Sequence, residues 1–342
     1  MAENDGNENR YSNTSECQAT HTNYIQTTAT RLCMMGAAAL ALAGSCGEAF
    51  AASSTAPERH GSFPATSPDG GRIAFASSRG TVIPSGQSPW FYTHIFIMDM
   101  DGSKVRQLTT AQTADTAPVW TPDGTWIVFG AIDRKSQHET LDAVHPDGSA
   151  RHTIMAGDFL PWVRISPDGR RVIYTATRAD APAGVFTIRM DGTDSQPVNT
   201  GLDRPWDGIY SPDGRQIVFS RWPDPPDGPQ RRPTDVYIAD ADGANRRLIA
   251  TYPDLIQVPS WSPDRRSIAY QTYTGSKGEA DVVVLDIATG VFRRVSHRDG
   301  VYLDETPSWT PDGRLLFQST RSGRFEVYAM DADGSNVQLL TH

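Results

Sequence analysis

The repetitive part of this 342-residue sequence lacks cysteine altogether. Its three cysteines, Cys17, Cys33 and Cys46, all lie in the first 50 residues, so the region after residue 60 can form neither a disulfide framework nor a cysteine-based metal site. We therefore expect that region to be held together by side-chain packing alone, and we predict no cofactor.

Basic residues are also scarce. The chain has 31 Lys and Arg residues against 40 Asp and Glu residues, which gives a formal net charge of -9. Proteins that bind nucleic acid through its phosphates carry an excess of positive charge instead. The composition therefore argues against nucleic acid as a partner.

Signatures of catalysis and of metal binding are missing as well. The sequence has no G-x-S-x-G nucleophile motif. Segments that begin at Asp99, Asp240 and Asp331 resemble the opening of a calcium loop, but no bidentate glutamate follows at loop position twelve. His138, His145 and His152 do not share one face for zinc ligation. We predict no metal site and no catalytic residue.

The N-terminal tail, residues 1–60, contains an apolar run at residues 32–44 (LCMMGAAALALAG). Arg31 precedes this run and the A-x-A pattern Ala49-Phe50-Ala51 follows it, an arrangement typical of a secretory signal. The run is shorter than the roughly 20 residues of a typical membrane-spanning helix. We therefore predict a disordered tail with an export signal, and a periplasmic or secreted protein.

A second interpretation of the tail concerns Cys46. The segment Ala43-Gly44-Ser45-Cys46 loosely resembles a bacterial lipoprotein processing box, with Ala43 in place of the usual larger aliphatic residue. In that case Cys46 would carry lipid and the protein would be an outer-membrane lipoprotein. Contact with a membrane is expected only if Cys46 is lipidated, and otherwise it is a spare cysteine of the tail.

Beyond the tail, a Ser/Thr-Pro-Asp signature recurs six times at intervals of 45 to 54 residues. Its prolines are Pro68, Pro122, Pro167, Pro212, Pro263 and Pro311. A second marker, Asp-Gly or Thr-Gly, follows in each copy at Gly102, Gly148, Gly192, Gly243, Gly290 and Gly334. Both are turn sequences, because proline and aspartate favour turn geometry and glycine accepts positive φ.

Each repeat predicts four short strands. In the last one, residues 304–342, alternating apolar positions such as Leu315 and Phe317 fit a half-buried strand. Four-stranded units of this length close radially, so the sequence predicts an all-β, six-bladed β-propeller of four-stranded antiparallel blades over residues 61–342. The expected blades are residues 61–110, 115–156, 158–200, 204–251, 254–297 and 304–342. We expect blade 1 to pack against blade 6 without lending it a strand.

The repeat P-x-W-[ST]-P-D-G, I-x-[FY]-x-S-x-R, [IV]-Y-x-M-D-x-D-G and R-x-L-T resembles the propeller repeats of the TolB family. Trp120, Trp261 and Trp309 hold the tryptophan of that pattern. The resemblance covers nearly all of residues 61–342 and implies the propeller fold, but such repeats occur on binding proteins, on gating propellers of peptidases and on carbohydrate-active enzymes. TolB itself carries an α/β domain before its propeller, whereas about ten residues separate signal and propeller in this sequence, so a role in the Tol system is not expected.

Loop lengths predict where a partner binds. The turns within the first and last strand pairs of each blade are uniform, whereas the links on the opposite face vary and include inserts at residues 78–94 and 221–235. Variable loops on a rigid scaffold commonly carry function. The inserts contain Trp90, Tyr92, Arg221 and Trp222, residue types enriched at interfaces. An alternative is that these aromatic residues only cap neighbouring blades.

Charged residues recur on the same face, at the expected channel mouth. The full set of candidate partner-binding residues is Trp90, Tyr92, Asp115, Asp158, Arg178, Arg204, Trp206, Asp207, Arg221, Trp222, Asp254, Asp304, Glu305 and Arg321. The structural interpretation is that these Asp and Arg residues pair to join adjacent blades. The functional interpretation is a charged funnel that binds a peptide or a sugar.

The favoured hypothesis is an exported, non-catalytic propeller that binds a protein or peptide partner through its variable-loop face. The alternative is a carbohydrate-active enzyme, a lyase or hydrolase, that acts on an oligosaccharide with charged residues at the channel mouth.

Overall fold

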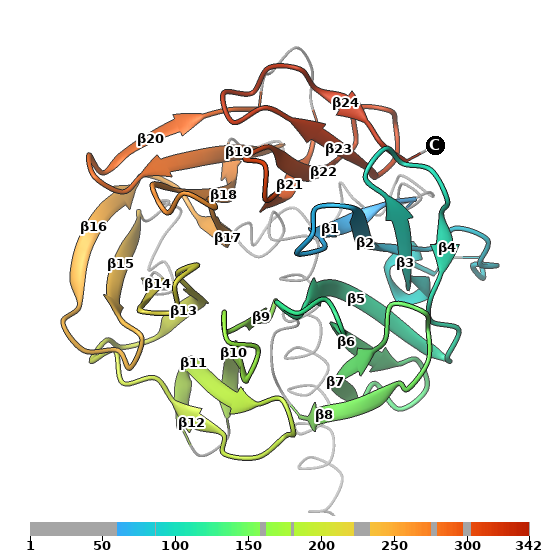
Figure 1. Ribbon diagram of the computed structural model, residues 1–342, viewed down its shortest axis with the longest axis horizontal. Coiled ribbons are helices and arrows are strands. Elements are labelled where there is room, and N and C mark those ends of the chain that lie inside the picture. Colours follow the sequence, from blue (N-terminus) through green and yellow to red (C-terminus); the bar gives the residue numbers. More distant parts are fainter. Residues whose placement is uncertain are drawn as a thin grey trace, which may run out of the picture. The chain divides into compact units, whose positions relative to one another are not determined.

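The computed structural model describes residues 60–85, 87–157, 162–178, 181–221, 233–274, 279–296 and 302–341, without the side chains of residues 177–183, 274 and 279. Within these residues, twenty-four strands form six four-stranded antiparallel sheets arranged in a ring (Figure 1). The prediction of a six-bladed propeller is therefore confirmed. The three cysteines, the apolar run, the cleavage pattern, Asp158 and Trp222 lie outside the described residues.

The strands follow chain order within every blade. Blade 1 comprises β1 (Ser62–Thr66), β2 (Arg72–Ser77), β3 (His94–Asp99) and β4 (Arg106–Gln107). Blade 2 comprises β5 (Thr113–Trp120), β6 (Ile127–Asp133), β7 (Glu139–Val144) and β8 (His152–Ala156). Blade 3 comprises β9 (Arg164–Ile165), β10 (Arg171–Arg178), β11 (Ala181–Arg189) and β12 (Gln196–Pro197).

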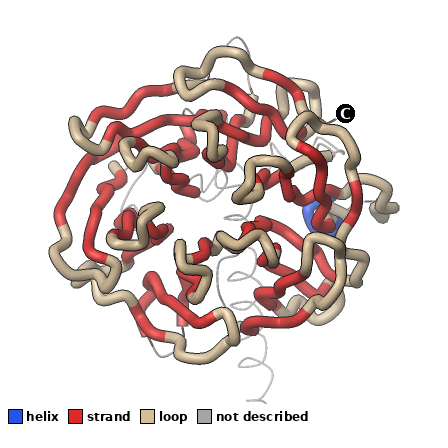
Figure 2. Tube along the Cα trace, viewed as in Figure 1, coloured by secondary structure: helices blue, strands red, loops and turns tan. Residues whose placement is uncertain are grey.

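The second half of the ring repeats this order. Blade 4 comprises β13 (Pro205–Tyr210), β14 (Gln216–Arg221), β15 (Thr234–Asp240) and β16 (Arg247–Tyr252). Blade 5 comprises β17 (Ile256–Trp261), β18 (Ser267–Thr274), β19 (Glu279–Asp286) and β20 (Val291–Arg294). Blade 6 comprises β21 (Asp304–Trp309), β22 (Leu315–Ser319), β23 (Glu326–Met330) and β24 (Gln338–Leu339). The helix of the described region is a single 3-10 turn, η1 (Pro89–Tyr92), and strands dominate the trace (Figure 2).

The Ser/Thr-Pro-Asp signature forms the turn between the first two strands of each blade. In blade 1 the Ser67 hydroxyl donates to Asp69 Oδ1, and the backbone N–H of Gly71 donates to the same oxygen at 3.0 Å. The Ser67 oxygen in turn accepts the backbone N–H of Arg72 at 2.9 Å. The hydroxyl-to-carboxylate bond recurs in all six blades, so the signature serves turn formation.

The Leu-Thr dipeptide at the end of a repeat also has a structural role. Thr109 Oγ1 accepts the backbone N–H of Ile95 at 2.9 Å, and Thr341 Oγ1 accepts that of Val327 at 2.9 Å. The Thr341 hydroxyl then donates to the buried Glu326 carboxylate. These side chains continue the pairing of the third and fourth strands where the short fourth strand has ended.

Ring closure brings blade 1 against blade 6 without strand exchange. The backbone N–H groups of His60 and Gly61 both donate to the Phe325 carbonyl oxygen at 3.0 Å. Gly102, at φ 84, lies so close to blade 6 that a Cβ atom there would be 2.1 Å from the Leu340 carbonyl oxygen. Glycine at this position therefore serves both the turn and the close approach of the two blades.

Apolar side chains fill the seams between neighbouring blades. At the closure, Ile73, Phe75 and Met98 of blade 1 pack with Leu316 and Val327 of blade 6 in one buried cluster. Equivalent clusters join blades 2 and 3, blades 4 and 5, and blades 5 and 6. Burying each such side chain contributes about 1.5–3 kcal/mol, so the seams supply most of the driving force for the ring.

Within the described residues, no helix is long and apolar enough to cross a membrane.

Candidate functional site: the central channel

The first strand of each blade lines the channel (Figure 1). Five of these strands break register with their neighbours shortly before the Ser/Thr-Pro-Asp turn. At each break one residue adopts a left-handed backbone; these are Phe63 (φ 53), Ala117 (φ 48), Asp207 (φ 50), Val258 (φ 53) and Thr306 (φ 52). Such bulges redirect the strand and re-aim its side chains, so the bulged residues form a ring around the channel.

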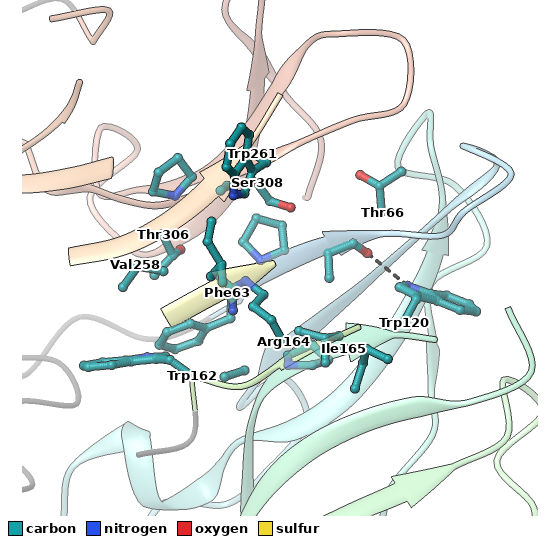
Figure 3. A pocket seen from close by; sticks show the side chains of 18 of the residues that line it. Phe63, Thr66, Trp120, Trp162, Arg164, Ile165, Val258, Trp261, Thr306 and Ser308 are labelled. Atoms are coloured by element: carbon teal, nitrogen blue, oxygen red, sulfur yellow. Dashed lines mark hydrogen bonds between the residues drawn. The ribbon is translucent and has the colours of Figure 1, made fainter. Parts of the chain in front are cut away.

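A cavity of about 250 Å³ occupies the channel at these bulges (Figure 3). Its walls combine apolar and aromatic side chains with a nearly equal share of polar surface. The lining residues on or next to the inner strands include Phe63, Pro118, Trp162, Arg164, Ile165, Ile209, Tyr210, Val258, Trp261, Thr306 and Pro307. An apolar hollow with a few polar groups is the usual form of a ligand site.

The cavity opens toward the face that carries the Pro-Asp-Gly turns. In blade 1 the lining runs from Phe63 and Pro64, which are buried, through Ala65 and Thr66, which are partly exposed, to Pro68, which is exposed. The same gradient occurs in blade 6, from buried Thr306 and Pro307 to partly exposed Ser308. The mouth of this cavity therefore lies on the uniform-turn side of the ring.

Arg164 of β9 is the charged side chain of this lining. Its Nη1 donates to the Val163 carbonyl oxygen at 2.9 Å, and its Nη2 donates to the Pro259 carbonyl oxygen of β17 at 3.1 Å. Burial lowers the pKa of Arg164, and the nearby Asp207 carboxylate acts in the opposite direction. Two hydrogen bonds thus hold a positive charge inside the channel.

Asp207 of β13 lies buried beside this charge. Its Oδ2 accepts the backbone N–H of Val258 at 2.9 Å, and its own backbone N–H donates to Thr175 Oγ1 at 3.1 Å. Burial raises the pKa of Asp207 to about 6, although the Val258 N–H and the Arg164 charge favour the ionised form. Burial also raises the pKa of Tyr270, and the negative charge of Asp207 acts in the same direction.

Four buried polar atoms in the lining have no hydrogen-bond partner within the described part of the chain: Thr66 Oγ1, Trp162 Nε1, Trp261 Nε1 and Thr306 Oγ1. Trp162 and Thr306 are the more deeply buried of these residues, at 7% and 6% exposed. Both residues line the cavity and are labelled in Figure 3. A buried donor without a partner is costly, so these atoms indicate a place where a ligand atom gains a hydrogen bond.

Asp304 and Arg321, both predicted site residues, lie together in blade 6. Arg321 Nη2 donates to Asp304 Oδ2 at 2.7 Å, and its guanidinium lies over the rings of Phe317 and Tyr328. Burial raises the pKa of Asp304. The pair lies within one blade, whereas the structural interpretation expected Asp-Arg pairs between adjacent blades.

Glu305 takes part in a second buried network. Its Oε2 accepts Gln318 Nε2 at 2.7 Å, and its Oε1 accepts the Tyr273 hydroxyl at 3.3 Å. Tyr273 belongs to blade 5, so this carboxylate joins two blades. Gln318 completes the link to blade 1 because its Oε1 accepts the backbone N–H of Phe63 at 3.1 Å.

Asp115 is fully buried at the start of blade 2. It accepts hydrogen bonds from the hydroxyls of Thr109 and Thr113, and its carboxylate lies 3.3 Å from Arg151 Nη2 and 3.6 Å from His94 Nδ1. Burial acts to raise the pKa of Asp115, but nearby His94, the Arg151 charge and the hydrogen bonds from the Thr109 and Thr113 hydroxyls outweigh it and lower that pKa. Asp115 therefore joins blade 1 to blade 2.

The two aromatic candidates of blade 1 pack against the propeller. Trp90 is 7% exposed, and its ring centroid lies 5.2 Å from that of Phe63. The Arg134 guanidinium of blade 2 lies 4.8 Å from the Tyr92 ring centroid, and its Nε donates to the Phe91 carbonyl oxygen at 2.8 Å. This is the arrangement that the capping alternative expects.

The remaining candidates are spread over the blades. Trp206 is buried in β13 next to Asp207, and Arg204 lies before that strand with its Nε 3.6 Å from Asp203 Oδ2. Arg221 ends β14, Asp254 accepts the Thr234 hydroxyl through its carbonyl oxygen, and Arg178 ends β10 with its side chain undescribed. The structure thus pairs Asp304 with Arg321, whereas Asp158, Trp222 and the side chain of Arg178 lie outside its described part.

The sequence reasoning missed most of the cavity lining, although a signal was present. Phe63, Trp162, Val258 and Thr306 each lie four positions before the Ser or Thr of the Pro-Asp turn, and Arg164 lies two positions before it. Alignment of the six repeats on that turn places Phe63, Arg164, Val258 and Thr306 on the first strands of their blades and Trp162 just before β9. Within the described residues, no group of three or more His, Cys, Asp or Glu side chains is positioned to hold a metal ion.

The fold and the cavity define a six-bladed β-propeller with a charged, aromatic-lined central channel. The chain belongs to the TolB β-propeller family, because the family model of the TolB beta propeller domain matches residues 51–225 and 226–342. The predicted resemblance is therefore confirmed.

Individual relatives cover this chain in part. It is 28% identical over 185 residues to an uncharacterized protein of Agrobacterium fabrum, covering 52% of this chain and 56% of the relative. It is 32% identical over 111 residues to the Tol-Pal system protein TolB of Francisella tularensis, covering 31% of this chain and 25% of the relative. The chain thus matches only part of the length of these curated relatives.

The solved structure of TolB from Acinetobacter baumannii has the same fold. Its superposition covers 78% of this chain and 62% of that chain, with a TM-score of 0.61 and 19% identity.

Proposed function

We propose that this chain is an exported, non-catalytic propeller that binds a protein or peptide partner. Membership of the TolB propeller family supports a binding role, since TolB is named as a protein of the Tol-Pal system. The buried acidic residues near the channel support the same view. Asp115, Asp304 and Glu305 are each held in hydrogen-bond networks that join strands or blades, which is a structural role.

The observation that carries the proposal is the channel cavity. It combines aromatic walls with one fixed positive charge, and residues of these types concentrate the binding energy at protein interfaces. Its inner surface is set by strands rather than by loops, so it is largely formed before a partner arrives. A preformed site of this kind loses little conformational entropy on binding.

The variable-loop face remains a second proposed surface for the partner. The loop at residues 222–232 lies outside the described residues, so its contribution rests on its sequence alone. The two surfaces lie on opposite sides of the ring and can be tested separately.

Partner capture from a bacterial envelope extract tests the proposal with the full chain and three variants. Ser308→Trp fills the mouth of the cavity, because Ser308 lines it and is partly exposed. Deletion of residues 223–232 removes the variable loop. Ser335→Trp is the matched control, since Ser335 is exposed on an outer turn of the same blade.

We expect Ser308→Trp to lose the partner that the parent chain and Ser335→Trp retain. If only the loop deletion loses the partner, the binding site lies on the variable-loop face instead of in the channel. Capture that is equal for all four proteins, or turnover of acidic oligosaccharides by the parent chain, would contradict the proposed function.

A further inference from the structure

We propose that the channel cavity binds the free carboxylate at the end of a peptide whose last side chain is apolar. This inference rests on the proposed function and names the chemical class of partner that the site selects. It follows from the charge, the hydrogen-bonding groups and the size of the cavity.

The charge of the cavity is opposite to that of the chain. The chain as a whole carries a net charge of -9, yet the charged side chain of the lining is Arg164. A guanidinium pairs with a carboxylate through two parallel N–H bonds, which makes it a specific receptor for that group. The cavity therefore favours an anion in a protein that otherwise repels anions.

The guanidinium is already oriented for such a ligand. The Val163 and Pro259 carbonyl oxygens hold Nη1 and Nη2 at 2.9 and 3.1 Å. An arginine has five N–H donors, so these two bonds leave donors for a ligand. Because the side chain is fixed from two blades, little rotamer entropy is lost when a carboxylate binds.

The lining also contains buried groups that can donate hydrogen bonds. The indole N–H of Trp162 and the hydroxyl of Thr306 are buried and have no partner within the described residues. Both residues line the cavity together with Arg164 (Figure 3). A carboxylate brings only acceptor atoms and a negative charge, so it can take these donors together with a charge-assisted bond from Arg164, whereas an uncharged amide lacks that charge-assisted bond.

The size and walls of the cavity limit the rest of the ligand. The cavity volume of about 250 Å³ is below the ~300–1,000 Å³ of pockets for drug-sized ligands. The walls include Phe63, Ile209 and Val258. Space of this size accommodates one apolar side chain with its carboxylate.

A uronic acid also presents a carboxylate, but it suits these walls less well. Its several ring hydroxyls would each lose hydrogen bonds to water on entry, whereas an apolar side chain loses none. We therefore assign the cavity to the C-terminal end of a peptide. An acidic oligosaccharide is included in the test as the competing ligand.

Isothermal titration calorimetry with the full chain tests the assignment. The probes are short acetylated peptides that end in phenylalanine, leucine or alanine, each made as the free acid and as the C-terminal amide, together with trigalacturonate. The variants are Arg164→Gln, Arg164→Lys and the control Arg170→Gln, which removes a charge from the exposed turn of the same blade. Circular dichroism melts confirm that each variant folds.

We expect the free acid to bind about tenfold or more tightly than its amide, in line with the strength of a charge-assisted hydrogen bond. Arg164→Gln should abolish that difference, Arg164→Lys should reduce it, and Arg170→Gln should leave it unchanged. If Arg164→Gln fails to fold, the comparison of acid with amide on the parent chain and on Arg164→Lys still decides the matter.

Equal affinity for acid and amide, no binding of any peptide, or preferential binding of trigalacturonate would each overturn the assignment. These outcomes are separate from a failure of the proposed function. Partner capture that depends on Ser308, without peptide binding, would preserve the binding role of the channel and reject only the carboxylate.

Discussion

The guanidinium of Arg164 in blade 3 donates to the carbonyl oxygen of Pro259 in blade 5, 3.1 Å away, so one side chain joins two blades that are not neighbours. Asp207 of blade 4, which lies between them in chain order, binds the backbone N–H of Val258, the residue before Pro259. The charged groups of Arg164 and Asp207 therefore both hydrogen-bond to the backbone of the same inner strand, β17. Three blades share one electrostatic centre in the channel.

This centre predicts how stability depends on pH. Burial raises the pKa of Asp207 from its ordinary value of 3.8 to about 6, so the folded protein holds this proton more tightly than the unfolded chain does. The resulting stabilisation is fully present below about pH 4 and is lost as the pH rises through about 6. At ~1.4 kcal/mol per pH unit of pKa difference, its upper bound is about 3 kcal/mol.

Asp207→Asn should remove this dependence, because asparagine keeps an oxygen for the Val258 N–H and does not ionise. We expect the variant to be more stable than the parent at pH 7.5 by about 1–3 kcal/mol, and to lose that advantage near pH 4. Urea unfolding of both proteins between pH 4 and pH 7.5 gives the difference in their free energies of unfolding. The contributions of the surface aspartates cancel in this difference because both proteins have them. A difference that is constant with pH would contradict the raised pKa.

The same residue should tune the affinity of the cavity for a carboxylate. Arg164 and Tyr270 are the ionisable groups that interact with Asp207, and Arg164 stays charged throughout the accessible pH range. As the pKa of about 6 is passed, Asp207 becomes negative and offsets the charge that attracts the ligand. Affinity for a free-acid peptide should therefore fall several-fold between about pH 5 and pH 7.5.

Calorimetric titration of Asp207→Asn checks this expectation, since its affinity should be high at both pH values. The ligand's own carboxylate has a pKa near 3.5 and stays ionised throughout. Unchanged affinity of the parent chain between pH 5 and pH 7.5 would show that Asp207 does not act on the bound anion.

The scaffold could be predicted from the sequence because its signals are local. The Ser67 to Asp69 bond and its five counterparts connect residues two positions apart, so each turn can be predicted from the sequence of its own repeat. The number of blades and the order of strands then follow from counting the turns. Closure without strand exchange follows because the last repeat, like the first, contains all four of its strands.

The cavity could not be predicted because it depends on relations between repeats. Arg164 owes its position to a carbonyl oxygen 95 residues away, and Asp207 to a backbone N–H 51 residues away. The bulges of the inner strands include left-handed backbone at Val258 and Thr306, which are β-branched residues that rarely adopt positive φ, so their residue types did not predict it. Charge and residue type instead predicted Asp115 and Asp304 as site residues. In the structure these carboxylates pair with Arg151 and Arg321 of their own blades.

Gly102 offers a test of ring closure. Its Cβ as alanine would lie 2.1 Å from the Leu340 carbonyl oxygen, and its φ of 84 disfavours any side chain. Gly313→Ala is the matched control, because Gly313 has φ 87 but the Cβ of an alanine there would meet no neighbouring atom within 4 Å. Both variants carry the backbone strain of about 1–2 kcal/mol.

Only Gly102→Ala should add the clash that separates blade 1 from blade 6. We expect it to lower the free energy of unfolding by at least about 2 kcal/mol more than Gly313→Ala does, as measured by urea unfolding. Equal losses in the two variants would mean that the blades tolerate separation at this turn.

The Asp304–Arg321 pair should behave as a buried ion pair rather than as a surface contact. The side chains are 3% and 19% exposed, and the Oδ2 to Nη2 distance is 2.7 Å. Arg321→Met leaves an unpaired carboxylate whose pKa is already raised by burial, so the free energy of unfolding at pH 7 should fall by about 3–5 kcal/mol. Adding Asp304→Asn to that variant should restore part of the loss, because the uncompensated charge is removed.

Arg265→Met provides the surface comparison for this pair. Arg265 is paired with Asp213, but their side chains are 55% and 29% exposed, so its loss should cost less than about 1 kcal/mol. A double-mutant cycle at Asp304 and Arg321, measured by urea unfolding, gives the coupling directly. Additive effects of the two substitutions would contradict a buried pair, and a coupling of well over 1 kcal/mol would show that this predicted site pair serves to hold blade 6 together.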